Sequence, residues 1–178
     1  VHGTDYLDGA VNYCGALGFT DGRVWCPYRP EGHPERLSCE TGGVGVANAP
    51  EGRARLLAET LQTMVVEPEA GLAWVTVPPG ALERLGATAD DLDGIVEVPR
   101  TIAGVRMALL FREIAAGRVK VSLRSVGSVD VAAFSRPYGG GGHTKASGLS
   151  LEGSMAEAQA IVLAAARQYL AENGNGEA

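Results

Sequence analysis

Two apolar-rich runs joined by a short glycine-containing turn constrain the fold of this chain more than any other feature. The runs cover residues 104–112 and 118–126, and Ala115-Ala116-Gly117 connects them. A connection this short joins neighbouring antiparallel strands, whereas parallel strands need a long crossover. The sequence therefore predicts a β-hairpin and favours a mixed sheet over a purely parallel one.

Helices and further strands alternate along the rest of the chain from Pro50 onward. Apolar spacing and breaker residues predict a helix over about 50–64, a strand over 72–77, a helical turn ending at Gly86, a helix carrying Leu92, Ile95 and Val96 and stopping near Pro99, a short helix over 130–138, a strand over 145–151 and a long helix after Ser154. Ser154 and Glu157 form a capping-box pattern at the start of that last helix. The predicted fold class is α/β, a mixed β-sheet with an antiparallel hairpin, covered by helices.

Charge and hydropathy exclude some classes of function. The 178 residues carry a formal net charge of -6 with a pI near 5.1, which argues against sequence-blind wrapping of nucleic acid by a wholly basic domain. A local basic site is still compatible with this charge. Because there is no apolar run of roughly 20 residues and no basic-then-apolar leader, we expect a cytoplasmic protein without a membrane partner.

The run of four glycines that ends in His143 is the strongest local signal of function. Ordering Gly139 to Gly142 costs more backbone entropy than ordering other residues, and an ordinary surface turn does not need four glycines. Without Cβ atoms, consecutive amides can converge in a nest that holds phosphate oxygens, and His143 can donate a further hydrogen bond. A flexible linker is the alternative interpretation.

One face of the second hairpin strand collects polar donors. Alternation places Val119, Val121 and Leu123 on one face and Lys120, Ser122 and Arg124 on the other. Arginine suits bidentate contacts with phosphate. A solvated face of a half-exposed sheet would show the same alternation, and the sequence does not establish that this face meets the glycine loop.

An ordered series of motifs resembles a known family. The segments Val119 to Ser125 (VKVSLRS), Asp130-Val131, Gly139 to His143 and Ala146-Ser147-Gly148 follow one another as in the DHHA1 module of DHH phosphoesterases, in particular the oligoribonuclease and pAp phosphatase branch of the nanoRNase type. Segments 93–96 and 102–113 are also similar to that branch. The resemblance spans roughly residues 50–172.

The resemblance implies a two-domain hydrolase. Its DHH domain would bind two Mn²⁺ ions through an Asp-His-His signature and hydrolyse short oligoribonucleotides, pAp or cyclic dinucleotides, while the DHHA1 domain holds the substrate. The residues that would hold phosphate or nucleotide are Arg124, Gly140, Gly141, Gly142 and His143, with Ser122 and Lys120 beside them. We expect no catalytic residue and no metal ligand in this chain.

The sequence departs from the family upstream of Pro50. It contains no Asp-His-His, and His2 and His33 are the only histidines before the glycine loop. We divide the chain into an irregular segment 1–49, a DHHA1 substrate-binding domain 50–172 and a polar tail 173–178. The irregular segment is either a diverged remnant of the catalytic domain or a linker, or a stretch outside the native reading frame. We expect the DHH domain to be missing and Mn²⁺ not to bind to this chain.

Two alternatives to the hydrolase stay open on the sequence. The first is a stand-alone nucleotide- or RNA-binding module without catalytic activity. The second is an α/β domain whose glycine run is only a linker. The sequence also leaves open whether the chain forms a homodimer and which phosphoester it would bind.

Overall fold

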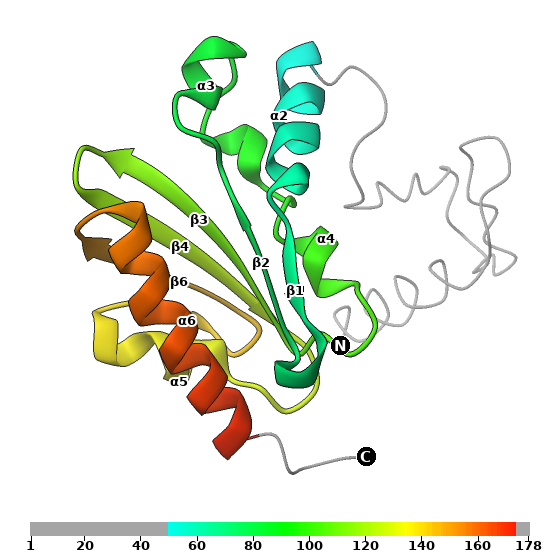
Figure 1. The fold of residues 1–178 in the computed structure, drawn as a ribbon, viewed down its shortest axis with the longest axis vertical. Helices are drawn as coiled ribbons and strands as arrows, with labels where there is room; N and C mark the ends of the chain where they lie inside the picture. Colours follow the sequence, from blue (N-terminus) through cyan, green and yellow to red (C-terminus); the bar gives the residue numbers. More distant parts are fainter. Residues whose placement is uncertain (1–49, 174–178) are drawn as a thin grey trace, which may run out of the picture. The chain divides into compact units, whose positions relative to one another are not determined.

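A computed structural model describes residues 50–173, which form a six-stranded mixed sheet with helices on both faces (Figure 1). The predictions for His2, His33 and the segment 1–49 lie outside the described residues. The α-helices are α2 (Glu51–Gln62), α3 (Ala81–Arg84), α4 (Glu97–Arg100), α5 (Val131–Ser135) and α6 (Met155–Glu172), with 3-10 turns η1 (Pro68–Ala70), η2 (Asp90–Leu92) and η3 (Arg136–Tyr138). The strands are β1 (Val65–Glu67), β2 (Leu72–Thr76), β3 (Met107–Ala115), β4 (Arg118–Ser125), β5 (Gly141–His143) and β6 (Ala146–Glu152).

The sheet has the mixed topology that the hairpin predicts. Its strand order is β1-β2-β3-β4-β6-β5, and β2–β3 is parallel while the other neighbouring pairs are antiparallel. The predicted hairpin is the β3–β4 pair, which turns at Gly117 with φ +72°. The predicted fold class is therefore confirmed.

The two faces of the sheet support two separate cores. On one face, Met107, Leu109 and Phe111 of β3 pack with apolar residues of α5 and α6. On the other face, Ala108 and Leu110 pack with residues of α2 and of the segment 92–96. Period-two alternation along β3 thus supplies both cores, and the strand is buried from Met107 to Phe111. Beyond Phe111 the strand emerges toward solvent, which leaves room for a surface site.

The predicted helix ending near Pro99 is wrong in its boundaries. The segment instead divides into η2 and α4, because Asp93 is extended (ψ 131°) and Gly94 has φ +88°. Pro99 lies inside α4, where the first turn tolerates proline because its missing N–H would have no partner within the helix. The strands β1 and β5 were not predicted, since three residues are too few to show a period.

The capping box at the start of α6 is confirmed, and its contribution to the stability of the protein can be tested. The Ser154 hydroxyl accepts from the Glu157 N–H (3.3 Å), and the Ser154 N–H donates to Glu157 Oε2 (2.8 Å), which lowers the pKa of Glu157. We expect Ser154→Ala to lower the free energy of unfolding by about 1 kcal/mol, measured by urea denaturation. Ser128→Ala, at an exposed serine outside any helix, is the control, and an equal loss in both variants would contradict this role of the cap.

Candidate functional site

A hollow of about 160 Å³ lies between the β3–β4 hairpin and the segment 89–96. Ligand sites that enclose a complete small molecule measure roughly 300–1,000 Å³, so this hollow has room for one part of a larger ligand. The side chains and backbone that line it belong to Ala89, Asp90, Leu92, Asp93, Gly94, Val96, Leu110, Arg112, Lys120, Ser122 and Arg124. Three of these residues are cations, and they all come from the two strands of the hairpin.

The predicted polar face of β4 forms the floor of this hollow. Lys120, Ser122 and Arg124 all line it, while Val119, Val121 and Leu123 are buried in the opposite core. The alternation predicted from the sequence is therefore confirmed. Three of the seven predicted site residues come together here, and they offer an ammonium, a hydroxyl and a guanidinium group to the same space.

Arg124 is held in place by neighbouring groups. Its Nε donates to Glu97 Oε1 (2.7 Å) and its Nη1 donates to the Leu123 carbonyl (3.0 Å). The side chain remains 29% exposed. While Glu97 occupies the Nε–H, Arg124 can bind a phosphate only through the N–H groups of its two terminal nitrogens.

The glycine run forms a turn followed by an edge strand. The Gly139 N–H donates to the Arg136 carbonyl and the Gly140 N–H to the Ser135 carbonyl, both at 3.0 Å. These two amides therefore do not take part in the predicted phosphate nest. Gly141, Gly142 and His143 are exposed and form β5 at the edge of the sheet.

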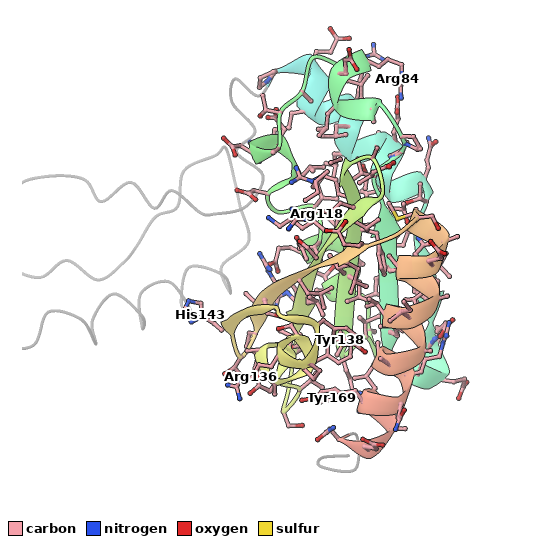
Figure 2. All side chains as sticks on the ribbon, turned by 90° about the vertical axis from the view of Figure 1, so that its left-hand side faces the viewer. Arg84, Arg118, Arg136, Tyr138, His143 and Tyr169 are labelled. Atoms are coloured by element: carbon pink, nitrogen blue, oxygen red, sulfur yellow. The ribbon has the colours of Figure 1, made fainter. Side chains whose placement is uncertain are left out.

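An aromatic cluster anchors the segment that precedes the glycine run (Figure 2). The ring of Phe134 in α5 packs edge-on against the ring of Tyr169, with 5.4 Å between the ring centroids. The centroid of the Tyr138 ring lies 5.9 Å from that of Phe134. The Tyr169 hydroxyl donates to the Asp130 carbonyl (3.0 Å), and burial raises the pKa of Tyr169, which keeps this donor protonated. The cluster fixes α5 and η3 and thereby the start of the glycine turn.

Strand register places His143 on the same face as Arg124. His143 is the partner of Ala146, and Ala146 is the partner of Arg124, so the three residues form one row across β5, β6 and β4. Directly paired residues point to the same face, and two strand spacings separate the ends of the row by roughly 10 Å. Figure 2 shows His143 on the side of the sheet opposite α6. Neither His143 nor the glycines line the hollow, so the seven predicted residues do not share one cavity. Gly142 lies in the row of Leu123 and so does not share the face of His143.

Arg112 is a candidate residue that the sequence analysis missed. It lies on β3 directly opposite Lys120 and lines the same hollow. The signal was present in the sequence, because a hairpin that turns at Gly117 brings the end of one run against the start of the other. The predicted polar face rested on the second strand alone and therefore left Arg112 out.

The rim of the hollow carries carboxylates on a defined turn. The N–H and hydroxyl of Thr88 donate to Asp91 Oδ2 (2.8 and 3.0 Å), and these hydrogen bonds lower the pKa of Asp91. The turn positions Asp90 and Asp93 at the hollow. Acceptors on the rim and cations on the floor suit a ligand that has both an anionic group and hydrogen-bond donors.

The described residues do not fit a metal site. Within residues 50–173, no group of three or more His, Cys, Asp or Glu side chains is arranged to hold an ion. The donors on the floor of the hollow are cationic and suit an anion rather than Mn²⁺.

None of the helices in this part of the chain is long and apolar enough to cross a membrane.

Comparisons with known proteins agree with the motif series. The DHHA1 domain family matches residues 73–172. Two proteins named bifunctional oligoribonuclease and PAP phosphatase NrnA are similar: that of Thermus thermophilus is 32% identical over 149 residues (78% of this chain, 44% of the relative), and that of Bacillus subtilis is 36% identical over 83 residues (47% and 26%). The chain thus spans less than half the length of these relatives.

A solved structure, an exopolyphosphatase-related protein from Bacteroides fragilis, matches the fold with a TM-score of 0.66 at 28% identity, over 72% of this chain and 38% of that one. The likeness therefore extends from sequence motifs to the arrangement of strands and helices. The family match runs from within β2 to the end of α6 and includes the hairpin, the hollow and the glycine loop. Because it covers more than half of the chain, the chain belongs to the DHHA1 domain family.

Proposed function

We propose that residues 50–173 bind the phosphate-bearing end of a nucleotide or short oligoribonucleotide for a phosphoester hydrolase. The observation that carries the proposal is the hollow itself, where Lys120, Ser122 and Arg124 project from one strand toward the same space. Donors to phosphate are cations, hydroxyls and main-chain amides, and this floor supplies the first two. The names of the NrnA relatives support the choice of nucleotide substrates.

The described residues would position the substrate and would not break bonds. A DHH domain with two Mn²⁺ ions would activate water and neutralise the charge that develops on the phosphoester. Arg124, held by Glu97 and by the Leu123 carbonyl, provides a fixed donor for one phosphate. A fixed donor lowers the entropy lost when the reacting groups are brought together.

His143 and Gly141 would contact the part of the ligand that extends beyond the hollow. His143 is exposed and lies in the cross-strand row that ends at Arg124. A methyl group added at the Cα of Gly141 would meet no atom within 4 Å, so a ligand can approach the main chain there. A nucleotide whose phosphate contacts Arg124 would therefore pass close to the His143 ring.

Binding and turnover measured on the same chain test this proposal. We expect titration calorimetry to detect binding of pAp and of a 5′-phosphorylated dinucleotide, and we expect His143→Ala to weaken binding by about tenfold, as for the loss of one charge-assisted hydrogen bond. Thr144→Ala, at the exposed neighbour of His143, is the control and should leave binding unchanged.

A hydrolysis assay with Mn²⁺ on the same samples completes the test. Binding without turnover agrees with a substrate-holding domain, and turnover would contradict the absence of catalytic residues from this chain. If neither ligand binds, the proposal is wrong. If they bind and the native gene product has no DHH domain, the stand-alone binding module is the correct interpretation.

A further inference from the structure

We propose that Arg112 and Lys120 form a second phosphate subsite at the hairpin end of the hollow, which makes the site select ligands with two separate phosphates over mononucleotides with one. The inference rests on the proposed function, because it assumes that Arg124 holds a first phosphate. It adds a residue, Arg112, and a preference among the proposed ligands for those that carry two separate phosphates.

The first observation is an uncompensated pair of like charges. Arg112 and Lys120 are directly opposite in the register of β3 and β4, where like charges destabilise a sheet. Six ion pairs join side chains within residues 50–173, and neither of these two cations takes part in one. A bound phosphate would neutralise both and offset the repulsion between them.

The second observation is that these cations and Arg124 open onto the same hollow. Arg112, Lys120 and Arg124 all line it, with the Ser122 hydroxyl between the two positions of β4. The rim carboxylates of Asp90 and Asp93 also line the hollow, yet both stay outside ion-pairing distance of the two cations. The positive charge of the pair therefore remains available to a ligand.

The third observation is spacing. Lys120 and Arg124 are four residues apart on one strand, which corresponds to about 14 Å between their Cα atoms. Glu97 holds the Arg124 guanidinium at 2.7 Å and so keeps it at its own end of the hollow. A direct hydrogen bond spans only about 3 Å, so the two cationic ends are best satisfied by two different phosphates of one chain.

The test compares ligands that differ only in length. Calorimetric titration with AMP, pApA and pApApA, in EDTA to prevent hydrolysis, is performed on the wild type and on the double variant Arg112→Gln/Lys120→Gln. We expect the wild type to bind pApA at least about tenfold more tightly than AMP, through the charged hydrogen bonds to the second phosphate. In the double variant this preference disappears, because the affinity for pApA falls at least about tenfold further than the affinity for AMP.

A matched control removes the same charge elsewhere. Arg55→Gln/Arg118→Gln alters two exposed arginines that pair with Glu51 and Glu152 outside the hollow, and it should keep the preference for pApA.

The dependence of the binding affinity on salt concentration is a second measurement. Binding of pApA should weaken more steeply with salt than binding of AMP in the wild type, because more phosphates release counterions, and the two slopes should coincide in the double variant.

The outcomes separate this subsite from the function it rests on. If the wild type binds AMP and pApA equally, or if the double variant keeps the preference, the second subsite is wrong while nucleotide binding stands. A proportional loss for both ligands in the double variant also overturns it, because the pair would then serve the first phosphate. If the wild type binds neither ligand, the proposed function fails together with the subsite.

Discussion

Replacement of Gly140 by alanine lowers the free energy of unfolding by about 3 kcal/mol, as expected for overpacking in a well-packed region. A Cβ at Gly140 would lie 2.4 Å from the Gly148 carbonyl oxygen, 2.7 Å from Leu149 Cβ and 2.9 Å from Ser135 Cβ. Two of these atoms belong to β6 and one to α5, so the loop could accept the methyl group only by separating from both elements. Thermal and urea unfolding measure the loss.

The glycine run contains its own control. Gly141 has open space around a new Cβ and no positive φ, so Gly141→Ala should leave stability within about 0.5 kcal/mol of the wild type, as is usual at a surface position. Gly142→Ala should resemble Gly140→Ala, because Gly142 has φ +146° and its Cβ would lie 2.4 Å from the Ala146 carbonyl oxygen. Equal stability of the Gly140→Ala and Gly141→Ala variants would contradict this account of the loop.

Arg124→Ala weakens the binding of pAp between about tenfold and a hundredfold, the range expected when one or two hydrogen bonds to a charged group are lost. The effect is large because Arg124 is a preorganised donor, fixed by Glu97 and by the Leu123 carbonyl before any ligand arrives. Arg124→Lys should give an intermediate affinity, since it keeps the charge and loses the fork of donors. Titration calorimetry on all three proteins gives the comparison.

Arg118 supplies the matched control for Arg124. It lies on the same strand, carries the same charge and pairs with Glu152 (3.5 Å), but it does not line the hollow. Arg118→Ala should therefore bind pAp like the wild type. If both variants lose affinity equally, net charge rather than a defined site governs binding, and the assignment of Arg124 is wrong.

The sequence predicted the elements that depend on local pattern. The β3–β4 hairpin, the alternating faces of β4 and the Ser154–Glu157 cap each rest on spacing within a few residues, and all three are confirmed. The break between η2 and α4 was missed, because it depends on the positive φ of Gly94, and a lone glycine does not reveal which φ the fold will impose. The boundaries near Pro99 were wrong for this reason.

The site was harder to predict because it depends on contacts between distant segments. The glycine run was interpreted as a phosphate nest, yet Gly140 and Gly142 have packing reasons to be glycine, namely their contacts with Gly148, Leu149 and Ala146. Glu97, which holds Arg124, is 27 residues away in sequence. No local sequence pattern links Glu97 to Arg124. The sequence could therefore identify Arg124 as a donor but could not show that Glu97 already accepts one of its hydrogen bonds.

The most direct test of nucleotide binding at this hollow is an NMR titration of the ¹⁵N-labelled chain with pAp. The account predicts that the largest amide shift changes fall on residues 120–124, on the segment 89–96 and on residues 141–143, and that they are absent from Arg124→Ala at the same ligand concentrations. Shift changes concentrated on α6, at the opposite face of the sheet, would contradict it and move the ligand away from the hairpin.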